Sequence, residues 1–119
     1  MINWNNLDTL TSFKELSEVE RVNLAEVMSG ENGAERVKNY SVPMTEDLTY
    51  NYAAKAVDDK VLAALAKLAK EAQLTEKYAA LYNGEVINTG EKRLVLHQLT
   101  RGQLGDKVEA DGVDKREFY

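Results

Sequence analysis

The chain has 119 residues, enough for one small domain at most. Its formal net charge of -5 argues against a surface that binds nucleic acid or an anionic membrane. It has no cysteine, so disulfides, thiolate chemistry and cysteine-based zinc sites are excluded. The N-terminal MINWNNLDTL lacks the basic and apolar regions of a signal peptide, and no apolar run approaches the roughly 18 residues of a membrane span. We therefore expect a soluble, cytoplasmic protein.

The first third of the chain predicts short helices. The range Asp8–Leu16 has helical character, and Ser17 with Glu20 has the spacing of a capping box that starts a second helix. We expect Gly30 and Gly33 to end that second helix, and Ala34–Lys38 to add one more turn. Its apolar residues recur at helical spacing: Val22, Leu24, Val27 and Met28.

The range Tyr40–Tyr52 predicts a small β-hairpin. Two β-prone stretches flank the polar residues Thr45–Asp47, which suit a turn. Pro43 is the only proline, and a position on an edge strand would accommodate it.

The clearest helix begins after the hairpin, with Asp58 or Asp59 as its cap. A second helix is predicted over Thr75–Tyr82, ended by Gly84 after Asn83. A third is predicted over Arg93–Thr100. The apolar stripe of the first of these helices consists of Leu62, Leu65, Leu68, Ala69 and Ala72.

The C-terminal residues predict a turn and then the start of a helix. The turn is expected at Asp111–Gly112, and Asp114 with Glu117 has the spacing of a capping box. The sequence stops five residues after Asp114, and isolated helices that short are unstable. We expect that the domain is truncated here; a frayed terminus is the alternative.

Three features that suggest chemistry have simpler explanations. His97, the only histidine, lies among apolar residues and is expected to be a hydrogen-bonded core or interface residue. The stretch Gly102–Lys107 lacks the ending of a phosphate-binding loop and follows a predicted helix, so a plain loop is expected. Four tyrosines are expected to pack in the core or in interfaces rather than to stack on bases: Tyr50, Tyr52, Tyr78 and Tyr82.

Residues 82–101, YNGEVINTGEKRLVLHQLTR, have a recognisable form. This segment resembles the signature of the phosphoglucose isomerase family, roughly N-G-E-x-I-N-x-T-E-x-R-A-V-L-H-x-A-L-R. Four residues depart from it: Gly90, Leu94, Leu99 and Thr100. The matching residues are Asn83, Gly84, Glu85, Ile87, Asn88, Glu91, Arg93, Val95, Leu96, His97 and Arg101.

The resemblance extends over about residues 40–118. In the hairpin it rests on Leu48, Tyr52 and Lys55, and near the C-terminus on Ala110–Gly112. In the long helix the matching residues are Leu65, Leu68, Ala69, Lys70 and Glu71.

Enzymes of this family are several times longer and interconvert glucose 6-phosphate and fructose 6-phosphate. The resemblance implies that residues 1–119 are a single N-terminal segment of such an enzyme, and that the catalytic residues follow this segment. It implies no catalytic, cofactor-binding or metal-binding residue in this chain. The fold expected is mainly α with a small β-hairpin (α+β), attached to a larger α/β enzyme of the sugar-isomerase type.

Five residues of the signature are expected to have a structural role: Asn88, Glu91, Arg93, His97 and Arg101. Asn88 or Glu91 should make hydrogen bonds at the start of the predicted helix, and Arg93 or Arg101 should reach a carboxylate or backbone carbonyls, because charges within an apolar motif are costly unless paired.

The expected partners are the remainder of the parent chain and, in the complete enzyme, a second subunit, with no nucleic acid, no membrane and no cofactor. The alternative is a free-standing helical interaction protein derived from this segment, without isomerase activity.

Overall fold

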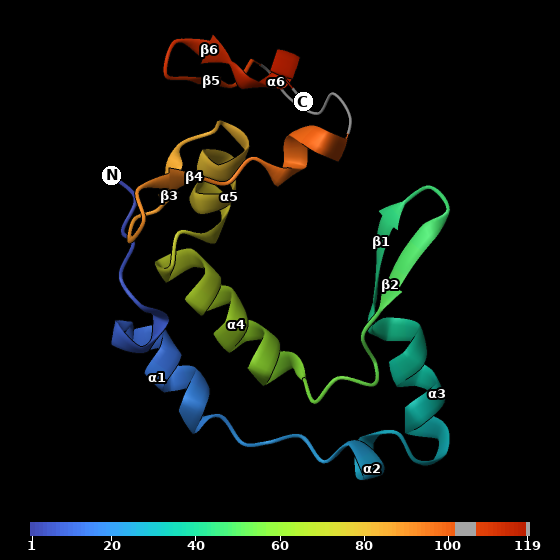
Figure 1. Cartoon of the computed structure of the whole chain (residues 1–119). Helices are drawn as coiled ribbons and strands as arrows, with labels where there is room; N and C mark the ends of the chain where they lie inside the picture. Colours follow the sequence, from blue (N-terminus) through green and yellow to red (C-terminus); the bar gives the residue numbers. More distant parts are fainter. Residues whose placement is uncertain (102–106, 119) are drawn as a thin grey trace. The chain divides into compact units, whose positions relative to one another are not determined.

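The computed structural model describes residues 1–101 and 107–118 (Figure 1). The chain divides into two compact units. The first unit combines Met1–Leu10 with Leu68–Tyr119, and the second is Thr11–Lys67. Both contain helices and small antiparallel sheets, so the fold is mixed α and β. Within the described residues, no helix has the length and apolar character needed to cross a membrane.

The helix predicted over Asp8–Leu16 is divided in the structure. A 3-10 turn, η1, covers Leu7–Thr9, and the helix α1 covers Thr11–Glu18. Leu10 separates them because its backbone is extended, with φ -86° and ψ 141°. An extended residue cannot continue the helical hydrogen-bond pattern.

The capping box predicted at Ser17 and Glu20 is wrong. Ser17 lies inside α1, where its hydroxyl donates a hydrogen bond to the carbonyl of Lys14 at 2.6 Å. The next helix, α2, is a single turn over Leu24–Val27. Its cap is Asn23, whose side-chain oxygen accepts a hydrogen bond from the backbone N–H two residues on, at 3.2 Å.

The predicted break lies close to Gly30, since α2 ends at Val27 and the next helix, α3, covers Gly30–Asn39, but the break predicted at Gly33 is wrong. Gly30 is the first residue of α3, with φ +63°. Gly33 lies within α3, where a Cβ would be 2.2 Å from the carbonyl oxygen of Met28. The absence of a side chain therefore permits the backbone of the preceding turn to approach α3 closely.

The predicted hairpin is confirmed. β1 (Ser41–Thr45) pairs antiparallel with β2 (Leu48–Asn51), and the two strands follow α3 (Figure 1). Val42 lies opposite Tyr50, and the register shifts between Pro43 and Thr45. In a two-stranded sheet each strand is an edge, which is where proline is tolerated.

A buried arginine connects α3 to the loop that follows the hairpin. Arg36 is 7% exposed; its Nε donates to the carbonyl of Ala53 at 2.8 Å, and its Nη2 donates to those of Lys55 at 3.0 Å and Val57 at 2.6 Å. Its guanidinium also lies 4.2 Å from the centre of the Tyr40 ring. These contacts hold the loop against α3 and distribute the charge over carbonyl dipoles and an aromatic face.

The long helix α4 covers Asp59–Glu71, as the sequence predicts. Asp58 is its cap, since its Oδ1 accepts a hydrogen bond from the N–H of Val61 at 2.8 Å. The predicted apolar stripe is only partly covered, because Leu65 remains 39% exposed while Ala72 is 8% exposed. Burying an alanine such as Ala72 costs almost no side-chain conformational entropy.

The helix α5 covers Leu74–Tyr82, close to the predicted range. Gln73, which separates α4 from α5, has a left-handed backbone with φ 53°. Its Oε1 accepts a hydrogen bond from the backbone N–H of Asn3 at 2.7 Å, and the ammonium of Lys77 lies 5.5 Å from the centre of the Trp4 ring. These two contacts attach the N-terminal residues to the junction of α4 and α5.

The helix predicted over Arg93–Thr100 is wrong. β4 (Arg93–Leu94) pairs antiparallel with β3 (Val86–Asn88), and only a 3-10 turn, η2, forms over His97–Arg101. Lys92 has φ +54°, which reverses the chain in front of β4. A tight turn replaces the predicted start of the helix.

The predicted C-terminal turn is confirmed, between β5 (Glu109–Ala110) and β6 (Val113–Asp114). Both turn residues, Asp111–Gly112, have positive φ, 55° and 73°. Asp114 caps α6 (Lys115–Phe118), accepting a hydrogen bond from the N–H two residues on at 2.9 Å. In the part of the chain that the structure describes there are thus three two-stranded sheets, where one hairpin was predicted.

The described residues bury few large side chains. Val108, 1% exposed, is the largest side chain that is fully buried among them. Tyr52 is half-buried, whereas Tyr50, Tyr78 and Tyr82 are exposed and so do not pack in the core; their packing in interfaces stays a prediction. The buried apolar residues are mostly alanines: Ala53, Ala64, Ala72, Ala80, Leu99 and Val108.

Candidate functional site

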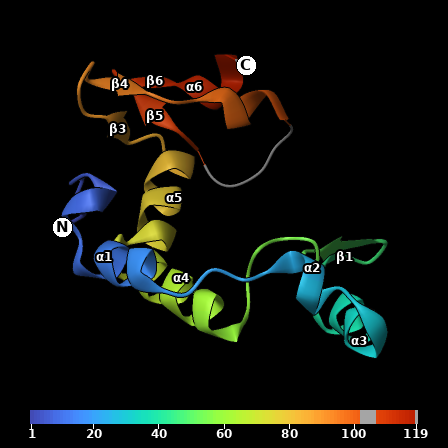
Figure 2. The same cartoon turned by 90° about the horizontal axis from the view of Figure 1, so that it is seen from below.

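The signature segment begins where α5 ends. Gly84 has φ +72°, and the N–H of Glu85 donates to the carbonyl of Ala80 at 2.9 Å, which closes the helix. A Cβ on Gly84 would be 2.3 Å from Cγ1 of Val108. The chain then turns into β3, which contacts α5 (Figure 2).

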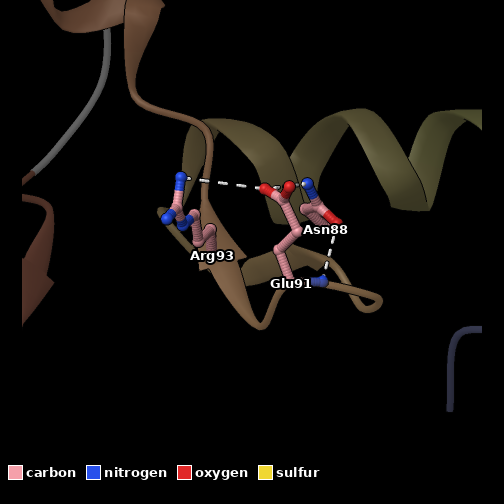
Figure 3. Close-up of polar contacts among 3 residues, drawn as sticks. All are labelled: Asn88, Glu91 and Arg93. Carbon is pink, nitrogen blue, oxygen red and sulfur yellow. Dashed lines mark hydrogen bonds and ion pairs between the residues drawn. The ribbon is translucent and has the colours of Figure 1, made fainter.

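Asn88 and Glu91 fix the turn between β3 and β4 (Figure 3). The Oδ1 of Asn88 accepts a hydrogen bond from the backbone N–H of Glu91 at 3.1 Å, and its Nδ2 donates to Oε2 of Glu91 at 3.3 Å. Asparagine bonded to the backbone in this way is common in turns. The two residues therefore meet as expected, but they hold a turn and not the start of a helix.

Arg93 extends this cluster from the first residue of β4 (Figure 3). Its Nη1 lies 3.8 Å from Oε2 of Glu91, and the side chains are 76% and 63% exposed. Water therefore hydrates both charges, and an exposed pair of this length contributes little stability. Arg93 thus reaches a carboxylate, as predicted, but the pair lies at the surface.

His97 begins η2 and is exposed, so it is not a core residue, and its expected place in an interface stays a prediction. It borders a small open cavity of about 210 Å³ together with Leu94, Leu96 and Thr100. The hydroxyl of Thr100 donates to the carbonyl of His97 at 2.8 Å. Arg101, the last residue of η2, is exposed as well.

Gln98 was not among the predicted site residues. Its Nε2 donates a hydrogen bond to the carbonyl of Leu81 at 2.9 Å, which connects η2 to the last turn of α5. Leu99, the next residue, is 5% exposed. In the sequence, the only indication was that Gln98 is a polar residue next to an apolar one. Its hydrogen-bond partner, Leu81, could not be predicted because the fold brings the two together.

The described residues contain no group of three or more His, Cys, Asp or Glu side chains arranged to hold a metal ion. The loop predicted at Gly102–Lys107 falls largely on residues 102–106, which lie outside the described residues. The geometry of the segment is thus that of a turn cluster, with exposed charges that contact one another.

Comparison with known proteins identifies the family. The model of the family described as phosphoglucose isomerase matches residues 51–117. The glucose-6-phosphate isomerase of Treponema denticola is 54% identical over 121 residues, covering 98% of this chain and 23% of that protein. Those of Treponema pallidum and Borreliella afzelii are 47% and 40% identical, covering 99% and 100% of this chain and 22% of each relative. The chain spans less than a quarter of the length of these relatives, and it belongs to the phosphoglucose isomerase family.

Proposed function

We propose that this chain acts as the N-terminal segment of a glucose-6-phosphate isomerase, an aldose-ketose isomerase that interconverts glucose 6-phosphate and fructose 6-phosphate. One observation carries the proposal. The Treponema denticola isomerase is 54% identical across 98% of this chain, and that match covers only 23% of the relative. Similarity at this level along nearly the whole chain favours the same structural position in the same kind of enzyme.

The segment's part in the enzyme is structural. Asn88, Glu91 and Arg93 make their polar contacts with one another in a surface turn, which supports a role in shaping the segment. The catalytic residues then belong to the rest of the isomerase chain, which is the segment's main partner. The complete enzyme is a cytoplasmic homodimer in this proposal.

A chimaera tests the proposal. This chain replaces the matching 121 residues of the Treponema denticola isomerase, and the conversion of fructose 6-phosphate to glucose 6-phosphate is measured. The control is the same relative with the matching residues deleted. We expect an active chimaera and an inactive deletion; an inactive chimaera that folds like the parent enzyme contradicts the proposal.

A further inference from the structure

The β1–β2 hairpin, the loop that follows it and the start of α4 line an open apolar hollow of about 370 Å³, here called the hairpin hollow. Of the described residues that line the hairpin hollow, Lys55 alone is charged. The lining consists of Val42, Tyr50, Tyr52, Lys55, Val57 and Leu62.

The wall of the hairpin hollow is held in place by aromatic contacts. Val42 and Tyr50 lie opposite each other across the hairpin. The rings of Tyr50 and Tyr52 stack with centres 6.1 Å apart, and Tyr40 meets Tyr52 edge-on at 5.2 Å. Ring pairs of both kinds are favourable and restrict side-chain rotation.

The floor of the hairpin hollow is also ordered. It includes Val57 and Lys55, whose backbone carbonyls accept hydrogen bonds from Arg36. The hollow is therefore formed before anything enters it, which lowers the entropic cost of binding.

The hairpin hollow leaves apolar surface in water. Val42 is 45% exposed and Tyr50 is 50% exposed. Each Å² of such surface that becomes covered stabilises the assembly by about 25 cal/mol. Covering this surface by an apolar group is therefore favourable.

We infer that an apolar side chain of the isomerase chain outside this segment occupies the hairpin hollow. The inference rests on the proposed function, in which more than three quarters of the enzyme lies outside the segment, as in the relatives. Lys55 at the lining favours an occupant that has a carboxylate or a carbonyl oxygen beside its apolar side chain.

The size of the hairpin hollow favours the same chain over a second copy. A stable dimer needs about 800 Å² from each partner, far more than a hollow lined by six side chains supplies. A segment of the same chain is present at a high effective concentration, so a small apolar contact is sufficient for it.

Cysteine labelling in the chimaera tests the inference, since this chain has no cysteine of its own. Val42→Cys places a thiol in the hairpin hollow, and Thr49→Cys places one on the adjacent pair of the same hairpin. Side chains of neighbouring pairs point to opposite faces. Both replacements nearly conserve size, and mass spectrometry of the modified peptides gives the rate of reaction with N-ethylmaleimide.

In the active chimaera we expect Val42→Cys to react at least about tenfold more slowly than Thr49→Cys, because reaction requires local opening. Equal rates in an active chimaera overturn the inference and leave the proposed function intact. Protection that disappears on dilution of the enzyme identifies a second copy as the occupant and also overturns the inference. A folded but inactive chimaera overturns the proposed function, and the inference with it.

Discussion

Gly84 and Val108 are in contact at the end of α5. A Cβ built on Gly84 would lie 2.3 Å from Cγ1 of Val108, and Val108 is 1% exposed. Gly84 also has φ +72°, a conformation that other residues adopt at a cost. The signature segment and the C-terminal residues of the first unit therefore pack together through the missing side chain of a glycine.

Replacement of Gly84 by alanine should lower the free energy of unfolding by about 3 kcal/mol, the sum of a backbone and an overpacking cost. Gly30→Ala is the matched control, because Gly30 has φ +63° with nothing within 4 Å of a Cβ. It should lower the stability by only about 1 kcal/mol. Urea unfolding of the purified variants measures both, and equal losses would show that the contact with Val108 is unimportant.

Arg36→Lys should destabilise the protein by about 2–3 kcal/mol, although the charge is kept. Arg36 donates three hydrogen bonds to backbone carbonyls, and an ammonium group cannot reproduce the geometry of the planar guanidinium. Arg21→Lys, at an exposed position, is the control and should have almost no effect. The structural assignment of Arg36 fails if the two variants unfold at the same urea concentration.

The pKa of the Tyr40 phenol is raised, first by burial and then by the hydrogen bond to Asp59, whose Oδ1 lies 3.1 Å from the hydroxyl; Arg36 opposes the shift. A raised pKa in the folded state favours the neutral phenol, so this contribution to stability is complete below the unfolded pKa of about 10 and is lost as the pH rises through the folded pKa.

Asp59→Asn should therefore lower the pKa of Tyr40, measured as the phenolate absorbance that disappears in the matched Tyr40→Phe variant. Tyr40→Phe should also reduce the loss of stability above pH 10. An unchanged or higher pKa in Asp59→Asn would show that the carboxylate does not act on the phenol.

Asn88→Ala should lower the stability by about 1 kcal/mol, because the N–H of Glu91 loses its acceptor. Arg93→Ala should change it by less than about 0.5 kcal/mol, since the ion pair is long and exposed. In the active chimaera, Arg93→Ala should leave the Michaelis constant for fructose 6-phosphate unchanged. A sharp rise in that constant with unchanged stability would indicate that Arg93 contacts the substrate.

Elements with local signals could be predicted from the sequence. The polar turn of the hairpin, the Asp58 cap of α4 and the Asp111–Gly112 turn each depend on residues close in the chain. Gly33 was misjudged because its place inside α3 depends on the close approach of Met28. That approach is a property of packing, which a helix propensity does not describe.

The signature segment shows the same division. The contact of Asn88 with Glu91 is local and could be anticipated. The helix predicted over Arg93–Thr100 came from a short apolar run, and such runs do not distinguish strand from helix. The expectation that His97 could lie in the core rested on that predicted helix, whereas the residue is exposed. Gln98 was missed because its hydrogen-bond partner, the carbonyl of Leu81, is brought close only by the fold.

The central claim is that this chain can take the place of the N-terminal segment of a glucose-6-phosphate isomerase. The most direct test is kcat/KM of the chimaera with the Treponema denticola enzyme, measured against that parent enzyme. We predict a value within about tenfold of the parent, equivalent to less than about 1.4 kcal/mol of transition-state stabilisation. A chimaera that folds and assembles like the parent but shows no isomerase activity would contradict the claim.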